Sequence, residues 1–221
     1  MQDFGKYKQS TVDRFRSILV ANPAGTYDEA ALPAYTNPNP LMRWLFWQRI
    51  KIVLQYLETI DALGSVMDFG CGLGVMLPYL NQRATEVIAV DKEVGPVQQL
   101  AREMQWSKTM FQSNLSLLSA KYHNGLNIIL ALDVLEHVDD LEHTLESFSH
   151  LLRKDGRLIV SGPTENLFYR TGRKLAGYSG DYHCRNVYAI ERSASLRFVT
   201  SRVAVLVPAM PLFIIFQGRP A

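Results

Sequence analysis

Three glycines alternate in the segment Val66-Met-Asp-Phe-Gly-Cys-Gly-Leu-Gly-Val75, directly after an apolar run that ends on an acid. Glycine lacks the Cβ that would hold a ligand away from the main chain, so such a loop brings bare backbone close to a bound molecule. A helix that follows begins with free N–H groups and a positive dipole end, which favour a carboxylate or phosphate. The segment therefore predicts a strand, a ligand-binding loop and a helix.

Two carboxylates narrow the type of ligand. Dinucleotide-binding loops follow the pattern Gly-x-Gly-x-x-Gly, but Val75 occupies the third glycine position here. Asp68, at the strand end, would be a poor neighbour for a pyrophosphate and suits an amine or a cation. Asp91 ends a second apolar run about 20 residues on, where a carboxylate accepts hydrogen bonds from ribose hydroxyls. These positions favour an adenosine that carries an amino acid.

Apolar runs and helical patterns alternate along the chain. The strands and helices that they predict hold the glycine loop, Asp68 and Asp91 in place. Besides the strand before the glycines, we expect strands over residues 86–91, 108–112, 126–132 and 157–161, and helices over 41–57, 94–106, 141–152 and 186–196. This alternation predicts an α/β fold with a doubly wound, mostly parallel sheet and ligands at the carboxyl ends of its strands. Residues 200–207 and 212–217 are two further strands, and their short connection makes them an antiparallel C-terminal hairpin.

Composition limits the classes of function. The 221 residues suit a single domain, and a net charge of +2 without an evident basic cluster argues against general nucleic-acid binding. Two cysteines make no disulfide framework, so we expect a reducing, cytoplasmic setting. The polar start indicates no signal peptide, and the longest apolar run, residues 203–216, is shorter than the roughly 20 residues that span a bilayer. No metal site is predicted.

Four motifs in order resemble those of class I S-adenosylmethionine-dependent methyltransferases. They are Asp68-Phe-Gly-Cys-Gly-Leu-Gly74, Asp91, Ala131-Leu-Asp-Val-Leu-Glu-His137 and Leu152-Arg-Lys-Asp-Gly-Arg-Leu-Ile-Val160. The resemblance covers residues 41–218, and the nearest branch is the small-molecule methyltransferases similar to those of ubiquinone biosynthesis. It implies a Rossmann-like, seven-stranded fold and S-adenosyl-L-methionine as methyl donor, with S-adenosyl-L-homocysteine as product. It also implies an enzyme that methylates a small-molecule acceptor by in-line displacement.

The same resemblance implies a set of cofactor contacts. Gly70, Cys71, Gly72 and Gly74 would pass under the methionine part, and Asp68 would lie near its amino group. The other implied contacts are Asp91 at the ribose, Lys92 beside the adenine, Asn114 and Leu115 at the adenine amine, and Leu132 and Asp133 along the methionine. The family often has aspartate where Asn114 stands, so this contact departs from the pattern.

An arginine upstream of the glycines is a further candidate. In the helical pattern of residues 41–57, Arg49 projects into the apolar arc and Arg43 lies near its edge. A buried guanidinium needs an anion. Its partner is either a protein carboxylate such as Asp68 or the carboxylate of S-adenosylmethionine, which related enzymes bind through an upstream arginine. Spacing favours Arg49, although Asn39-Pro-Leu-Met-Arg43 resembles the local motif.

We expect the acceptor side to come from residues 1–40, an irregular lead-in or lid, and from an insertion over residues 163–185. The insertion carries Arg170, Arg173, Lys174 and Arg185 with several aromatics. It is either a solvated surface helix or a pocket for an anionic or amphiphilic acceptor. If the acceptor is a hydroxyl, a base is needed, and His183 is the first candidate, followed by His137 and Glu165.

The resulting division is one methyltransferase domain over residues 1–221, with the cofactor core at 41–162 and a closing helix and hairpin at 186–221. Trp44, Trp47 and the apolar tail suit a lipid-like acceptor or docking at a membrane surface, though burial explains them more simply. His137 is either a catalytic group or a cap of the next helix. A non-catalytic S-adenosylmethionine-binding module and a nicotinamide oxidoreductase remain alternatives.

Overall fold

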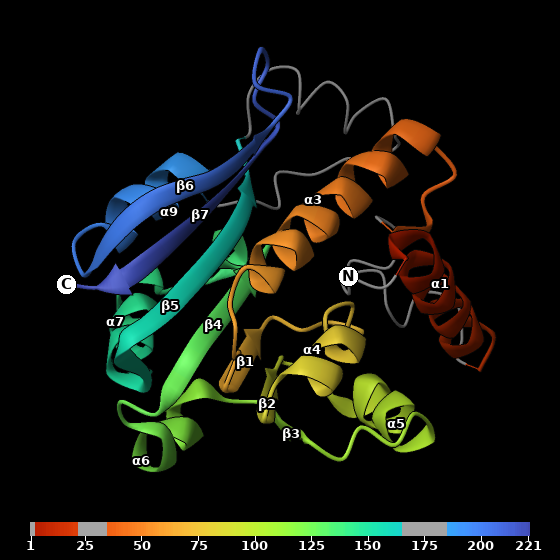
Figure 1. The fold of residues 1–221 in the computed structure, drawn as a ribbon, viewed down its shortest axis with the longest axis horizontal. Coiled ribbons are helices and arrows are strands. Elements are labelled where there is room, and N and C mark those ends of the chain that lie inside the picture. Colours follow the sequence, from red (N-terminus) through yellow and green to blue (C-terminus); the bar gives the residue numbers. More distant parts are fainter. Residues whose placement is uncertain (1–2, 22–34, 165–184) are drawn as a thin grey trace.

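Seven strands form one mixed sheet in the order β3-β2-β1-β4-β5-β7-β6. The computed structural model describes residues 3–21, 35–164 and 185–221 (Figure 1). The strands are β1 Ser65–Phe69, β2 Glu86–Val90, β3 Thr109–Gln112, β4 Leu126–Leu132, β5 Leu152–Pro163, β6 Phe198–Leu206 and β7 Phe213–Pro220. Strands β1 to β5 pair in parallel, whereas β7 pairs antiparallel with both β5 and β6. The predicted doubly wound sheet with an antiparallel C-terminal hairpin is confirmed.

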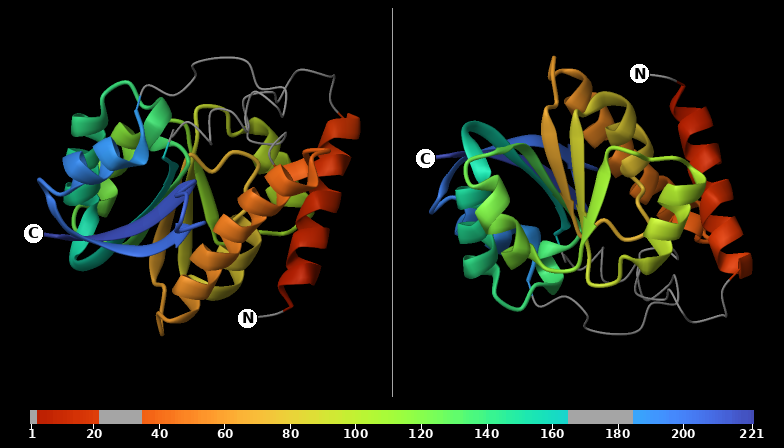
Figure 2. Two further views of the ribbon diagram at one scale, coloured as in Figure 1. Left: turned by 90° about the horizontal axis from the view of Figure 1, so that it is seen from above. Right: turned by 90° about the horizontal axis from the view of Figure 1, so that it is seen from below.

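Helices cover both faces of this sheet, as Figure 2 shows. They are α1 Phe4–Ala21, α3 Pro40–Glu58, α4 Leu77–Arg83, α5 Gly95–Glu103, α6 Ser119–Tyr122, α7 Leu141–Leu151 and α9 Val187–Ala194, with short 3-10 helices η1 Leu115–Leu118 and η2 Leu135–His137. Successive strand residues point into two hydrophobic cores, one on each face of the sheet. Val66 belongs to the core with α3 and α4, and Met67 belongs to the core with α7 and α9. This alternation is the period of two that a strand buried on both faces requires.

Local sequence explains where α3 begins and how it docks. The side chain of Asn39 accepts hydrogen bonds from the N–H groups of Leu41 and Met42, and Pro40 occupies the first helical position, where its missing N–H costs nothing. Near the other end, the Tyr56 hydroxyl donates to Gln217 of β7 and accepts from Arg157 of β5. These contacts fix α3 across the sheet.

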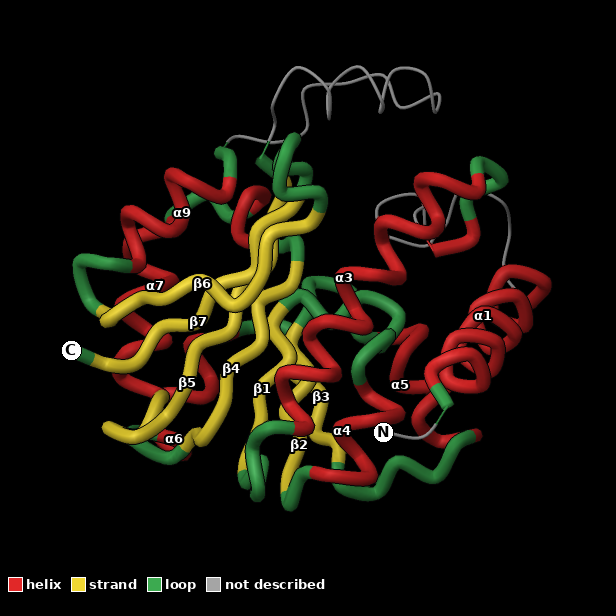
Figure 3. Tube along the Cα trace, turned by 45° about the horizontal axis from the view of Figure 1, so that its top comes forward, coloured by secondary structure: helices red, strands yellow, loops and turns green. Residues whose placement is uncertain are grey.

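The expectation of an irregular lead-in over residues 1–40 is wrong for residues 4–21, which form α1. The prolines at 23, 33, 38 and 40 suggested irregular chain, but all of them lie after this helix. Its apolar side buries Phe15, and Phe4 packs edge-on against Trp47 of α3. In Figure 3, α1 lies on the far side of α3 from the strands, so it forms an outer layer on this face.

One strand boundary differs from the expected one. β5 begins at Leu152, five residues before the expected start, because an irregularity in its pairing with β4 accommodates the predicted turn. The predicted strand β4 and the antiparallel hairpin are confirmed. Within the described residues, no helix combines the length and apolarity needed to cross a membrane.

Candidate functional site

The carboxyl ends of three neighbouring strands bring the predicted acids to one edge of the sheet. β1 lies between β2 and β4, with Asp68 in register with Ala89 and Leu130. Asp91 follows β2 directly, and Asp133 follows β4. The strand order reverses between β1 and β4, and in open α/β sheets ligands bind in the crevice at such a point. The predicted cofactor residues of these three loops therefore share one site.

The glycine loop needs glycine for two physical reasons. Gly70 and Gly74 adopt φ values of +73° and +77°, in the left-handed region that side chains rarely enter. A Cβ at Gly70 would lie 2.4 Å from a methyl carbon of Val134, and one at Gly74 would lie 2.8 Å from Leu77. The loop therefore lies tightly against both the segment after β4 and the start of α4.

The amides of this loop are largely used within the protein. The N–H groups of Gly70 and Cys71 donate to the Val90 carbonyl, and that of Gly72 donates to Asp91 Oδ2 at 2.8 Å. The expectation of free N–H groups at the following helix is wrong: Leu77 donates to Gly74, and Pro78 has no N–H. The loop therefore offers carboxylates rather than a phosphate cradle, which disfavours a dinucleotide.

Asp91 retains the capacity to hold a diol. Its Oδ2 accepts from Gly72, and its Oδ1 accepts from the Glu93 N–H at 3.3 Å. A carboxylate has about four lone-pair sites, so each oxygen keeps room for one more donor. The half-buried side chain lies at the end of β2, where the prediction places the ribose.

Asp68 is the unusual acid of the site. Its side chain is 3% exposed, and Oδ2 has no hydrogen-bond partner among the described residues. Burial, with a further contribution from the charge of Asp91, raises the pKa of Asp68 to about 7. A buried carboxylate without a partner is costly, and a ligand ammonium group at Oδ2 would remove that cost.

Arg49 is buried at the same edge, and its partner within the protein is a carboxylate, but Asp133 rather than the suggested Asp68. Its Nη1 forms an ion pair with Asp133 Oδ2, and its Nη2 donates to the Tyr35 hydroxyl at 2.7 Å. Asp133 has φ of +53°, and its Oδ1 accepts from Ser161 at 2.8 Å. Such a backbone conformation is strained for a non-glycine residue and is common at ligand sites. The ion pair ties α3 to the ends of β4 and β5.

Arg43, the other candidate, has a local role instead. Its guanidinium donates to the Asn37 carbonyl at 2.8 Å, so it stabilises the turn before α3. The Asn39-Pro-Leu-Met-Arg43 segment, which resembles a cofactor motif, therefore works here as a helix start.

The predicted adenine residues lie after β2 and β3. Lys92 and Asn114 are exposed, whereas Leu115 is half-buried in η1. Asn114 Oδ1 accepts from the N–H and the hydroxyl of Ser116, both at 2.9 Å, which fixes the side-chain amide. Leu132, on the methionine side, is half-buried at the end of β4.

Of the three candidate bases, one lies in the described part of the chain. His137 is exposed at the end of η2, while His183 and Glu165 lie outside the described residues. The alternative in which His137 caps the next helix is wrong, because Asp140 caps α7 by accepting from the His143 N–H. Arg170, Arg173 and Lys174 also lie outside these residues.

Arg185, at the end of the expected insertion, is engaged with the main chain. Its guanidinium donates to the carbonyls of Val138 and Asp139, at 2.6 and 3.0 Å. It therefore anchors the chain beside η2, and its charge is not arranged for an anionic acceptor.

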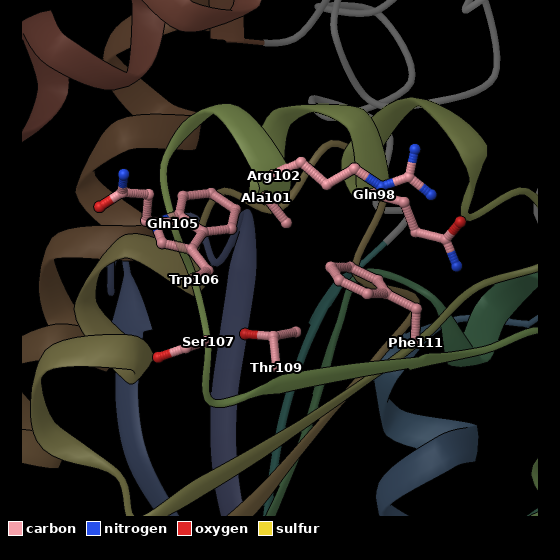
Figure 4. A pocket seen from close by; sticks show the side chains of 8 residues that line it. All are labelled: Gln98, Ala101, Arg102, Gln105, Trp106, Ser107, Thr109 and Phe111. Carbon is pink, nitrogen blue, oxygen red and sulfur yellow. The ribbon is translucent and has the colours of Figure 1, made fainter.

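Two hollows in the described structure lie apart from the predicted site residues. One, of about 430 Å³, lies between α5 and the edge strand β3 and includes Trp106 and Phe111 in its lining (Figure 4). The other, of about 250 Å³, lies between α1, α3 and α4. Neither contains a residue implied by the motifs, and we assign neither to the reaction.

Sequence reasoning missed three residues around the site. The Tyr7 hydroxyl of α1 donates to the Val75 carbonyl at the end of the glycine loop. Tyr35 and Ser161 orient Arg49 and Asp133. Tyr7 lies on a helical apolar face, a signal of burial alone, and Tyr35 lies in a proline-rich segment with no periodicity. Neither signal predicts a contact with residues so distant in sequence.

Comparison with known proteins gives a consistent picture. The sequence model of a family described as a methyltransferase domain matches residues 43–196. The ubiquinone biosynthesis O-methyltransferase of Photorhabdus laumondii is 25% identical over 105 residues, 46% of this chain and 44% of the relative. A Mycobacterium tuberculosis protein named a probable S-adenosylmethionine-dependent methyltransferase is 26% identical over 152 residues, 68% of this chain and 54% of the relative. The chain thus spans about half the length of these curated relatives.

The fold also occurs in a solved methyltransferase. The magnesium protoporphyrin IX methyltransferase of Synechocystis, crystallised with S-adenosylhomocysteine, superposes with a TM-score of 0.61 at 22% identity. The superposition covers 97% of this chain and 96% of the other. At this identity the similarity concerns the fold.

Proposed function

The chain belongs to the methyltransferase domain family, among the class I S-adenosylmethionine-dependent enzymes, and from this we propose that it transfers a methyl group from S-adenosylmethionine to a small-molecule acceptor. The observation that carries the proposal is the pairing of the glycine loop with Asp91. The Gly72 amide is bonded to Asp91, so the loop and the acid form one rigid unit at the end of β2. This unit suits a ribose diol and offers no phosphate cradle.

The methionine end of the cofactor fits the two charges beside that unit. We assign its amino group to Asp68, whose buried Oδ2 is without a partner in the described part of the chain. We assign its carboxylate to Arg49, the one arginine that is buried among the described residues. A cationic amine would satisfy the buried Asp68 oxygen, and the cofactor carboxylate would accept from the buried Nε of Arg49, which has no hydrogen-bond partner among the described residues although Nη1 is paired with Asp133.

Bound S-adenosylmethionine supplies a methyl group activated by its sulfonium. The contribution of the protein is mainly positional, because an in-line displacement needs the acceptor atom aligned with the methyl group. Leu132 and the strained Asp133 would fix one side of the methionine part. For a hydroxyl acceptor, His183, His137 or Glu165 would take the proton, in that order of preference.

The described surroundings of the acceptor side favour an apolar acceptor over an anionic one. Thr164, at the end of β5, donates its N–H to the Leu212 carbonyl, which places the β6–β7 turn beside the site. Val207, Met210 and Leu212 of that turn are half-buried. Trp47 is in the core, but Leu41 and Trp44 of α3 are 62% and 48% exposed. A lipid-like acceptor would match this apolar surface, and docking of the protein to a membrane is not required.

Calorimetric titration with S-adenosylhomocysteine tests the proposal. Asp91→Ala removes the two expected ribose hydrogen bonds, and at about 1.5 kcal/mol each this weakens affinity by about 100-fold. Asp91→Asn keeps an acceptor for Gly72, so a smaller loss there separates ribose binding from loop support. Asp155→Ala, at an exposed position of β5, is the matched control and should leave affinity unchanged.

Two further experiments test the alternative functions, a nicotinamide oxidoreductase and a non-catalytic binding module. Thermal stabilisation by NAD(H) and none by S-adenosylhomocysteine would contradict the proposal in favour of an oxidoreductase. Transfer of a labelled methyl group to any member of a panel of apolar hydroxyl, amine and carbon acceptors would exclude the non-catalytic module. Tight binding of S-adenosylhomocysteine with no turnover on that panel would favour the module.

A further inference from the structure

Tyr35 is held more firmly than its place in a proline-rich segment suggests. Its side chain is 4% exposed, and its ring packs against Phe15 of α1 and Trp47 of α3, with centroids 6.0 and 5.2 Å away. Its carbonyl accepts from the Trp47 indole N–H at 3.2 Å. Ring and main chain are therefore both fixed, which places the phenol oxygen at a defined point.

The phenol oxygen of Tyr35 is hydrogen-bonded to the guanidinium of Arg49. Nη2 donates to it at 2.7 Å, while Nη1 is paired with Asp133. The Arg49 guanidinium carbon lies 5.1 Å from the ring centroid of Phe46 and 5.6 Å from that of Phe213, so the cation is surrounded by rings rather than water. Its Nε is buried and has no hydrogen-bond partner within the described ranges.

The guanidinium fork is thus fixed by two protein oxygens on two elements. An arginine that is planar and locked at both terminal nitrogens presents its remaining donor and its charge in one orientation only. Burial raises the pKa of Tyr35, so the hydroxyl stays protonated and can accept from Arg49 while its own proton points elsewhere. Without the phenol oxygen, Nη2 would be a buried donor with no acceptor, which favours a different rotamer of the arginine.

We infer that Tyr35 is a positioning residue of the cofactor site, which acts through Arg49 to orient the guanidinium toward the carboxylate of S-adenosylmethionine. The inference rests on the proposed function. It also gives α1 a part in cofactor recognition, because Phe15 supports the Tyr35 ring from that helix.

The test uses two ligands that differ in the amino-acid part, which includes the carboxylate. S-Adenosylhomocysteine carries the amino-acid part, and 5′-methylthioadenosine lacks it. Tyr35→Phe keeps the ring and its packing and removes only the hydroxyl. We expect its dissociation constant for S-adenosylhomocysteine to rise about tenfold, the effect of one hydrogen bond to a charged group. The constant for 5′-methylthioadenosine should stay within about twofold, because that ligand makes no use of Arg49.

A matched variant and a double variant make the test specific. Tyr122→Phe also removes a bonded hydroxyl, the one that donates to Glu86 at 2.6 Å at the start of β2, and should change neither constant. Arg49→Lys keeps the charge but loses the planar fork. If Tyr35 acts through Arg49, adding Tyr35→Phe to Arg49→Lys causes no further loss of S-adenosylhomocysteine affinity.

The outcomes are distinct. Equal weakening of both ligands by Tyr35→Phe, or no weakening of either, would overturn the role of Tyr35 and leave the proposed function standing. Additive losses in the double variant would also overturn it, because the two residues would then act independently. Failure of the unaltered chain to bind S-adenosylhomocysteine would instead contradict the proposed function itself.

Discussion

The two sides of the site are built in different ways. On the cofactor edge, the contacts join two successive strand–loop segments: Gly70 and Cys71 bond to Val90, and Gly72 bonds to Asp91, 19 positions away. On the helical side, they join residues far apart, such as Tyr7 with Val75 and Arg49 with Asp133. The first side is specified by backbone geometry and two acids. The second is specified by aromatic packing around one buried cation.

This difference determines what each side tolerates. A short loop with positive φ values is destabilised when a Cβ is added, because its backbone cannot adopt another conformation and still make the same contacts. A packed layer of aromatic rings is destabilised when side-chain volume is removed, because a cavity remains and many contacts are lost. The following variants test whether the two sides respond in these separate ways.

The largest effect is expected in the helical layer. Phe15→Ala removes a side chain that is 2% exposed and packs on Tyr35, so the free energy of unfolding should fall by about 3–5 kcal/mol. Urea denaturation followed by circular dichroism measures it. Ser17→Ala, at an exposed position of the same helix, should change it by less than about 0.5 kcal/mol. A loss below about 1 kcal/mol for Phe15→Ala would mean that α1 is not part of the folded unit.

A smaller effect is expected in the glycine loop. Gly70→Ala places a Cβ 2.4 Å from Val134 at φ of +73°, which should cost about 2 kcal/mol of unfolding free energy and weaken S-adenosylhomocysteine binding. Gly95→Ala is the matched control, because a Cβ there meets no atom within 4 Å. Equal behaviour of the two variants in denaturation and calorimetry would show that the loop does not need its left-handed geometry.

The smallest effect concerns pH. Burial and the charge of Asp91 raise the pKa of Asp68 to about 7. In the proposed site, only the ionised acid would pair with the amino group of the ligand. The ionised fraction of Asp68 falls about tenfold between pH 8 and pH 6 when its pKa is about 7. The affinity for S-adenosylhomocysteine should therefore fall by about the same factor. Calorimetry across this range measures it, and Asp68→Asn should remove the pH dependence. A profile that is flat in the unaltered chain would contradict the role of Asp68.

The same acid also affects stability, with the opposite dependence on pH. Its folded pKa lies above the unfolded value of about 4, so the folded state binds the proton more tightly. The contribution of Asp68 to the free energy of unfolding should therefore decrease as pH rises from about 4 to about 7 and then level off. Comparison of the unaltered chain with Asp68→Asn isolates this contribution.

The same contrast explains what could be predicted from sequence. The mostly parallel sheet, the antiparallel hairpin and the position of Asp68, Asp91 and Asp133 at the carboxyl ends of strands follow from alternating patterns and local motifs. The sequence pattern does not predict helix α1, because the prolines that follow it indicate an irregular segment. The sequence offers Arg49 either a protein carboxylate such as Asp68 or the carboxylate of S-adenosylmethionine, whereas the register of α3 against β4 makes Asp133 its protein partner. Such a register depends on the packing of the whole layer, which no local pattern specifies.

A crystal structure with bound S-adenosylhomocysteine tests the central claim most directly. We predict that both oxygens of Asp91 accept hydrogen bonds from the ribose hydroxyls, at about 2.5–3.0 Å, while Gly72 remains bonded to the same carboxylate. The amino group should lie at Asp68 and the carboxylate at Arg49. A ribose bound away from Asp91, or a cofactor outside the crevice between β1 and β4, would contradict the account.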